Sequence, residues 1–362
     1  MKISKIAKPI AVIGAAAVVL GASGCSDTTW SFKTDAKTLS NGEWIYYTYA
    51  AYNSALSKVE EENYDGKDIE TRTIEGKTGA EWIQEEAKKT SLAHLTVEKL
   101  AAENKVEIDK SVVKMYKSQY SDYYKMAESL YTSLGVSEDS FADINATYPY
   151  VSNQLFEYLY GTDGPKAVSD DEIKKYVTEN YTDYYYLSYS LTKTDEEGKT
   201  VSIDEETLDK VESKFADYAK MLNEGKTTAD VETQYKTDFQ LGEDDTVPSR
   251  SACEALDKNE GISDDLKKAI TDLKEKTATV VKIDDTQYMI YRGDIKAKAD
   301  SVGSEEADAL SKSSVLYSMK NEEYKAYLEE EQKKLSYETN DACLSKYTVS
   351  RTVSIIQSES HK

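Results

Sequence analysis

Histidine, cysteine and the acidic residues are the side chains of this sequence that could perform chemistry, and their placement favours none of the common reactions. The two histidines are His94, inside a predicted helix, and His361, the penultimate residue. A serine or cysteine nucleophile activated by histidine would have to use one of these two. We interpret His94 as a helix-surface or core residue rather than a catalyst.

The sequence also lacks the motifs of common metal and phosphate sites. The sequence has no glycine-rich phosphate loop and no cysteine or histidine cluster suited to zinc. The acidic pairs Asp244–Asp245 and Asp264–Asp265 lack the glycine-punctuated spacing of a calcium loop. Glycoside hydrolysis by a pair of carboxylates remains an alternative, but no pattern favours it, because some of the 67 acidic residues will lie in pairs by chance. We predict no metal and no cofactor.

The first 25 residues have the order of a secretory signal followed by a lipidation site. Three lysines precede an apolar run over residues 9–20, which is too short to span a membrane. The run leads into LGASGC, which resembles the lipobox of bacterial lipoproteins with Cys25 as the lipidated residue. An ordinary cleaved signal with a chance cysteine is the alternative. We predict a signal peptide over residues 1–24 and an extracytoplasmic protein anchored to the membrane through lipid on Cys25.

Charge and aromatic content limit the partners. The net charge of −22 argues against binding nucleic acid and against lying on an anionic bilayer. It fits plain solubility, and it also permits weak attraction to basic, unfolded polypeptides. With 29 tyrosines against 5 phenylalanines, much of the aromatic core must be tyrosine, and each buried hydroxyl needs a partner.

Cys253 and Cys343 lie in segments assigned to different modules, so we expect two separate thiols.

The elements that must position these residues begin with helices. Apolar residues recur at spacings of three and four over residues 45–59, which is the pattern of one helix face. Further helices are predicted over residues 79–104, 109–135 and 141–159, the last with a kink or break at Pro149.

The middle of the chain reads as a separate domain. Turn formers cluster over residues 161–168, and Ser169 with Glu172 then forms a capping box. A strand over residues 184–192 runs into the acidic turn DEEGK, and a β-hairpin over residues 278–293 closes the domain. The helices between them are expected at residues 204–225, 228–235 and 263–273.

The C-terminal segment is predicted to return to the N-terminal one. A linker over residues 294–306 leads into a long helix, roughly residues 305–335. Over residues 347–355 apolar side chains alternate with threonine and serine, which is the period of a strand with one buried face. We predict that this strand pairs with Thr29–Lys33, so that the middle domain is an insertion.

The order of these segments resembles extracytoplasmic foldases of the SurA and PrsA class. Those proteins have a helical chaperone module made from both chain ends, with a parvulin-type prolyl isomerase domain between them. Residues 168–181 resemble the helix that leads into a parvulin domain, and YSLTKTDEEGK resembles its first strand and turn. Residues 215–238 resemble its helix pair and residues 278–295 its closing hairpin.

The resemblance implies a peptide groove at the positions of the family's two histidines. Those positions fall at Tyr189 on the first strand and at Met289, beside Tyr288, on the last. Because no histidine lies between residues 95 and 360, the family's paired-histidine cluster cannot form. Rotation about an X–Pro amide has a barrier of about 18–20 kcal/mol and needs no covalent intermediate. The replacement of both histidines therefore does not by itself decide whether the domain is an active prolyl isomerase. Tyr189 either offers its hydroxyl to the groove or is a half-buried strand residue.

The predicted fold class is α+β. A mainly helical chaperone module is formed by both chain ends, which are joined by a small two-stranded pairing, and a parvulin-like α/β domain is inserted in it. The predicted parts are the signal peptide over residues 1–24, the N-terminal helical module over residues 25–165, the parvulin-like domain over residues 166–298, and the returning C-terminal helix and strand over residues 299–362.

The predicted function is that of a lipid-anchored extracytoplasmic chaperone. Its partners would be unfolded or proline-containing secreted polypeptides, and its prolyl isomerase activity is expected to be weak or absent. Two alternatives remain from the sequence. One is an active peptidyl-prolyl cis-trans isomerase with a substituted pocket, and the other is a cell-surface lipoprotein that binds a ligand or partner.

Overall fold

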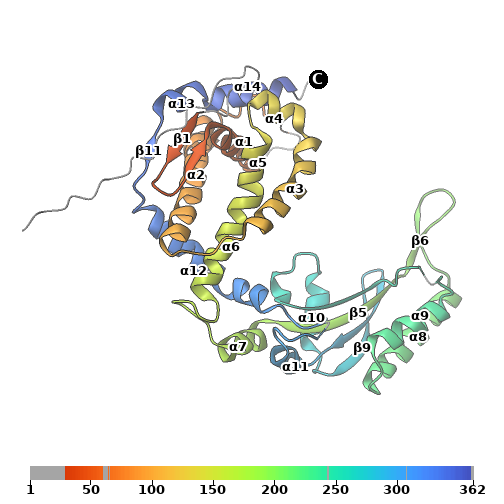
Figure 1. Ribbon diagram of the computed structural model, residues 1–362. Helices are drawn as coiled ribbons and strands as arrows, with labels where there is room; N and C mark the ends of the chain where they lie inside the picture. Colours follow the sequence, from red (N-terminus) through yellow and green to blue (C-terminus); the bar gives the residue numbers. More distant parts are fainter. Residues whose placement is uncertain (1–28, 60–63, 65, 243, 307, 360–362) are drawn as a thin grey trace, which may run out of the picture. The chain divides into compact units, whose positions relative to one another are not determined.

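The structure is a mainly helical α+β fold with small antiparallel sheets (Figure 1). This computed structural model describes residues 29–59, 64, 66–242, 244–306 and 308–359. The predicted signal peptide and its lipidation site, Cys25, lie outside these residues. Within the described ranges, none of the helices combines the length and the apolar character that crossing a membrane requires.

The chain divides into two compact units. The first contains the described residues up to Leu155 and those from Tyr327 onward, and the second is Phe156–Ala326. Both division points fall inside helices, α6 (Tyr148–Tyr160) and α12 (Lys312–Gln332). They therefore differ from the predicted boundaries, of which 165/166 lies in a loop and 298/299 lies inside α11 (Ile295–Asp300).

Aromatic packing inside the second unit explains this difference. Phe156 and Tyr324 meet edge to face with ring centroids 5.4 Å apart, and Phe156 also lies 5.3 Å from Tyr317. The second half of α6 and the first half of α12 are thereby held together as part of the second unit.

The first unit is built around the helices α1 (Asn41–Ser57) and α2 (Gly79–Glu103), which pack on each other. Each begins at a capping box, in which a Ser or Thr hydroxyl and a Glu carboxylate satisfy backbone N–H groups of the first turn. The other elements of this unit are the strands β3 (Thr73–Ile74) and β4 (Lys77–Thr78) and the helices α3 (Lys110–Met126), α4 (Glu128–Leu134), α5 (Glu138–Ala142), η1 (Asp143–Thr147), α13 (Asp341–Lys346) and α14 (Val349–Glu359).

A three-stranded sheet joins the two ends of the chain in the first unit. Its order is β11 (Glu338–Thr339), β1 (Trp30–Lys33), β2 (Thr38–Ser40), and both pairings are antiparallel. Phe32 lies opposite Thr339. The predicted N-terminal strand is present, but its C-terminal partner is β11, and the sheet has three strands rather than two.

The strand predicted over residues 347–355 is wrong, because most of this segment is the helix α14. Its buried side chains follow the helical spacing i, i+3, i+4, i+7 and contact α1, α2 and α4. These side chains are Val349, Thr352, Val353 and Ile356. A short run of alternating Val, Ile, Ser and Thr satisfies both periods, and packing against three helices selects the helical one.

The third and fourth predicted helices are both interrupted. The third is divided at Ala127 into α3 and α4. The fourth consists of α5, the π-helical segment η1 and α6. Pro149 lacks an N–H group and cannot continue a regular helical ladder, and the wide turn η1 ends two residues before it.

The second unit contains a four-stranded antiparallel sheet of order β8-β5-β10-β9. One face of the sheet is covered by α8 and α9 around Phe215, and the other by α10 around Ile270. The strands are β5 (Thr182–Ser190), β8 (Ser249–Glu254), β9 (Thr277–Ile283) and β10 (Thr286–Arg292), with a separate hairpin of β6 (Thr192–Thr194) and β7 (Thr200–Ser202). The helices are α7 (Asp170–Asn180), α8 (Glu205–Asn223), α9 (Thr228–Asp238), η2 (Leu256–Lys258), α10 (Asp264–Asp272) and α11 (Ile295–Asp300).

Several local predictions in this unit are confirmed. Ser169 and Glu172 form the capping box of α7, and β9 and β10 form the closing hairpin. The strand β8 was missed, because its sequence SRSACE is polar and it lies at the edge of the sheet.

Several buried tyrosines have partners for their hydroxyls, as the composition predicts. Tyr218 donates to Asp238 at 3.0 Å, and Tyr124 donates to the carbonyl of Val136 at 3.0 Å. The hydroxyl of Tyr184 lies between Glu254 and Arg250. Tyrosine therefore serves as a core residue in both units.

Candidate functional site

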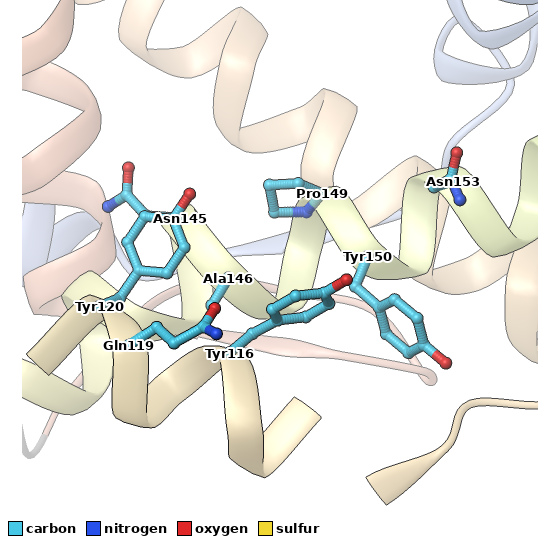
Figure 2. A pocket seen from close by; sticks show the side chains of 8 residues that line it. All are labelled: Tyr116, Gln119, Tyr120, Asn145, Ala146, Pro149, Tyr150 and Asn153. Carbon is cyan, nitrogen blue, oxygen red and sulfur yellow. The ribbon is translucent and has the colours of Figure 1, made fainter. Parts of the chain in front are cut away.

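A hollow of about 340 Å³ lies in the first unit between α3 and the helical segments η1 and α6 (Figure 2). No side chain that lines it is charged, in a chain whose net charge is −22. Figure 2 shows Tyr120 and Asn145 at one end, Tyr150 and Asn153 at the other, and Tyr116 between them. The lining residues are Tyr116, Gln119, Tyr120, Asn145, Ala146, Pro149, Tyr150 and Asn153.

Helix packing places the aromatic walls of this hollow. The helix α3 packs against η1 and α5, which brings Tyr116 edge to face with Tyr150 at 5.8 Å between ring centroids. Asn145 is fixed from two sides. Its Nδ2 donates to the carbonyl of Phe141 at 2.8 Å, and its Oδ1 accepts from the hydroxyl of Tyr46 at 3.2 Å.

Two amide side chains of the hollow remain available. Among the described residues, the amide groups of Gln119 and Asn153 have no hydrogen-bond partner, and both side chains are exposed. An amide offers both a donor and an acceptor, which is what a peptide backbone requires. The hollow therefore combines aromatic walls with polar groups that suit an extended polypeptide.

The apolar surface continues from the hollow along α3. Met115, Tyr123 and Met126 are 49%, 60% and 83% exposed, respectively. At about 100° per residue, the arc from Met115 through Tyr123 to Tyr120 covers about 140° of the helix circumference. Tyr124 is the only residue of α3 that is buried. We call the arc formed by Met115, Tyr116, Tyr120, Tyr123 and Met126 the α3 flank.

A buried polar cluster lies in the same unit and contains the histidine that the sequence singled out. His94 is fully buried on α2, and its Nδ1 lies 2.8 Å from the hydroxyl of Tyr47. Burial lowers the pKa of His94, so the imidazole is neutral near pH 7. Burial raises the pKa of Glu43. At Asp143 burial also acts to raise the pKa, but the neighbouring ammonium of Lys37 outweighs burial, and the pKa of Asp143 is lowered. His94 is thus a core residue, as predicted, but it belongs to a charged network.

The three predicted groove residues of the middle domain do not meet at one surface. Met289 is fully buried in the core beneath α8 and α9, and Tyr189 packs on that same face, with its ring 5.0 Å from Phe239. Tyr288 belongs to the opposite face, where its ring meets Tyr186 at 5.7 Å. The structure brings Tyr189 and Met289 together, and it separates Tyr288 from both.

The two described cysteines lie in different units and are free thiols. Burial raises the pKa of Cys253 to about 12, so this thiol is not a nucleophile near neutral pH. Cys343 is buried on α13, and its sulfur lies 2.8 Å from Oδ1 of Asn41.

The hollow was missed by sequence reasoning. Its tyrosines fall in the predicted helices over residues 109–135 and 141–159, and the signal that they serve a surface was the large number of aromatic and methionine residues on α3 for one helix. The meeting of Tyr116 and Tyr120 with Asn145 and Tyr150, at least 25 positions further along the chain, follows from tertiary packing that no local pattern encodes.

Comparisons with known proteins give distant structural likenesses. No family model matches the chain, and no curated protein is similar in sequence. The chain is similar to the crystal structure of foldase protein PrsA from Streptococcus pneumoniae, with 13% identity, a TM-score of 0.34, and coverage of 77% of this chain and 98% of that one. It is also similar to PrsA from Bacillus subtilis, with 15% identity, a TM-score of 0.23, and coverage of 92% and 93%. At such low identities and TM-scores, we draw no functional conclusion from either likeness.

Proposed function

We propose that this protein is a lipid-anchored extracytoplasmic chaperone that holds unfolded segments of secreted polypeptides in the hollow and on the α3 flank. The observation that carries the proposal is the uncharged, tyrosine-walled hollow, continuous with exposed aromatic and methionine side chains on one helix. Monomeric proteins rarely leave such apolar surface open without a use for it.

The residue types suit a client of variable sequence. Tyrosine offers a large, rigid contact surface at low entropic cost, together with a hydroxyl that can bond to a backbone. Methionine adapts its shape to different apolar partners. The amides of Gln119 and Asn153 can pair with any peptide group, because the backbone is common to all sequences. The site would therefore recognise exposed backbone and apolar side chains rather than one sequence.

The second unit is proposed to be a parvulin-like domain with weak or absent isomerase activity. Its element order supports this: a first strand β5, the helix pair α8 and α9, and a closing hairpin of β9 and β10. Burial of Met289 and the separation of Tyr288 from Tyr189 argue against a working pocket at the positions of the family's histidines. In a proline-peptide assay we expect a rate equal to that of the uncatalysed reaction.

The proposed location rests on the N-terminal sequence. Its lysines, short apolar run and LGASGC motif have the order of a lipoprotein signal, with Cys25 as the anchor. Lipid at this cysteine would hold an acidic body near the membrane without requiring it to bind anionic lipid.

Suppression of client aggregation tests the proposed function. The purified protein at molar excess should slow the aggregation of a reduced, unfolded client, and the double variant Tyr116→Ala, Tyr150→Ala should lose most of this protection. Tyr158→Ala is the matched control, since this tyrosine is exposed on α6 outside the hollow. Absence of protection by the unchanged protein would count against a chaperone. Equal loss in the control variant would count against the hollow as its site.

A further inference from the structure

A buried charged cluster lies where the β1–β2 turn, α1, α2 and η1 of the first unit meet. Glu43, His94 and Asp143 each bring one potential ligand atom to within 4.8 Å of the others. Glu43 is 4% exposed and His94 is fully buried. The ammonium of Lys37 bonds to Oδ2 of Asp143, and that of Lys117 lies 3.7 Å from Oδ1 of the same carboxylate.

Two buried atoms of this cluster lack a hydrogen-bond partner within the described part of the chain. They are Oε1 of Glu43, which lies 4.0 Å from the ammonium of Lys37, and Nε2 of His94, which lies 3.6 Å from Oε1 of Glu98. The other polar atom of each side chain is engaged, since Oε2 of Glu43 accepts from the N–H of Ser40 and Nδ1 of His94 pairs with the hydroxyl of Tyr47. Leaving a buried polar atom without a partner costs about 1–3 kcal/mol. Two such atoms in one cluster call for a further group between them.

We propose that Glu43, His94 and Asp143 bind a divalent transition-metal cation of the zinc class. An imidazole nitrogen with carboxylate oxygens is a donor set that suits Zn²⁺, whereas Mg²⁺ and Ca²⁺ prefer oxygen ligands alone. Three protein ligands would leave further coordination positions for water or another group.

The spacing of the ligands permits this assignment. Metal–ligand bonds of about 2.0–2.2 Å place the ligands of a tetrahedral zinc about 3.3 Å apart. Since all three ligand atoms lie within 4.8 Å of one another, no separation has to shorten by more than about 1.5 Å, a distance that rotation of the Glu43 and Asp143 side chains can cover. Oε1 of Glu98 lies 3.6 Å from Nε2 of His94. This distance is close to the ligand–ligand distance of about 3.3 Å in a tetrahedral zinc site, so Glu98 offers a further carboxylate.

The surrounding groups resemble the support that metal ligands usually have. A ligating histidine commonly donates its second ring N–H to a neighbour, and here Nδ1 faces the oxygen of Tyr47. Lys37 competes with the metal for Asp143. Its side chain is 20% exposed and belongs to the turn between β1 and β2, so the ammonium can move outward when a cation binds.

Zinc titration of the purified, chelator-treated protein tests the site. We expect one tightly bound Zn²⁺ per chain and an affinity at least roughly tenfold weaker in His94→Gln, because one of three ligands is lost. Lys37→Met should bind Zn²⁺ more tightly than the unchanged protein, because all three ligands remain and the competing ammonium is gone. A purely structural histidine would not produce this second effect. His361→Gln removes the other histidine and should leave the affinity unchanged.

Two outcomes would overturn the proposal. One is equal zinc affinity in the unchanged protein and in a folded His94→Gln variant. If that variant does not fold, Co²⁺ bound to the unchanged protein decides. Intense visible absorption of four- or five-coordinate cobalt supports the site, and a spectrum equal to that of the aquo ion rejects it.

Discussion

The helices α3 and α8 are built from similar residues but use them differently. Both are amphipathic and carry aromatic and methionine side chains. The helix α8 buries Val211, Phe215, Tyr218, Ala219 and Leu222 against the sheet of the second unit, whereas α3 buries only Tyr124. The same composition therefore builds a core in one helix and an open surface in the other.

The difference shows what decides whether an apolar helix face is structural. The apolar residues of α8 pack against β9 and β10 and are buried there. The arc of α3 extends beyond its contact with η1 and α5 to Met115, Tyr123 and Met126, which remain exposed. Stability accounts for the first arrangement, and binding of an apolar partner accounts for the second.

The largest expected effect is that of Phe215→Ala on α8. The ring is fully buried between Tyr218 and Tyr235, with centroids 5.7 and 6.4 Å away. Its removal leaves a cavity, so the free energy of unfolding should fall by about 3–5 kcal/mol. Urea denaturation monitored through the second unit measures this change. A loss below about 1 kcal/mol would contradict the assignment of α8 to a closed core.

A smaller effect is expected for Tyr218→Phe. The phenol of Tyr218 donates to Oδ2 of Asp238 at 3.0 Å, and the ring itself is fully buried. Deleting the hydroxyl removes one bond to a charged acceptor and should cost about 1.5–3 kcal/mol. The matched change on α3, Tyr123→Phe, should leave the free energy of unfolding within about 0.5 kcal/mol of the unchanged value.

Acid should weaken the second unit through Asp238. Burial opposes ionisation of this carboxyl, but hydrogen bonds from Lys214, Gln234 and Tyr218 outweigh burial and lower its pKa. A lowered pKa gives stability that is present above the unfolded pKa of about 3.9 and is lost as the pH falls through the folded value. Replacement by Asn should flatten this part of the stability profile, with a difference of below about 1 kcal/mol near pH 6. An unchanged slope below pH 4 would show that another carboxyl is responsible.

Sequence patterns predicted the elements whose periodicity is long and unambiguous. The predicted helices over residues 79–104 and 204–225, which are α2 and α8, extend over several turns with capping residues, and the closing hairpin has a two-residue turn between apolar strands. The segment 347–355 was misassigned because its short alternation of Val and Ile with Ser and Thr fits two periods. Tertiary contacts of α14 select between them, and the sequence does not display those contacts.

The candidate sites depend on contacts that are still less local. Tyr116 and Tyr150 meet because η1 widens the helical path between α5 and α6. Glu43, His94 and Asp143 come from three separate helical segments, and each alone reads as an ordinary helix residue. The tyrosine surplus did indicate a tyrosine-rich core, but it could not indicate which helix would remain uncovered.

The smallest effect on stability, and the most direct test of the comparison, is expected from Tyr123→Ser with Met126→Ser on α3. Both side chains are largely exposed, so their replacement should change the free energy of unfolding by less than about 0.5 kcal/mol. Protection of an unfolded client should nevertheless fall, because the α3 flank loses two of its apolar contacts. Aggregation kinetics at matched protein concentration measure this loss, and Tyr158→Ala again serves as the exposed-tyrosine control. If protection stays at the level of the unchanged protein, the exposed side chains of Tyr123 and Met126 do not contribute to binding the client. If stability falls as it does for Phe215→Ala, α3 is a core helix like α8, and the contrast between the two helices disappears.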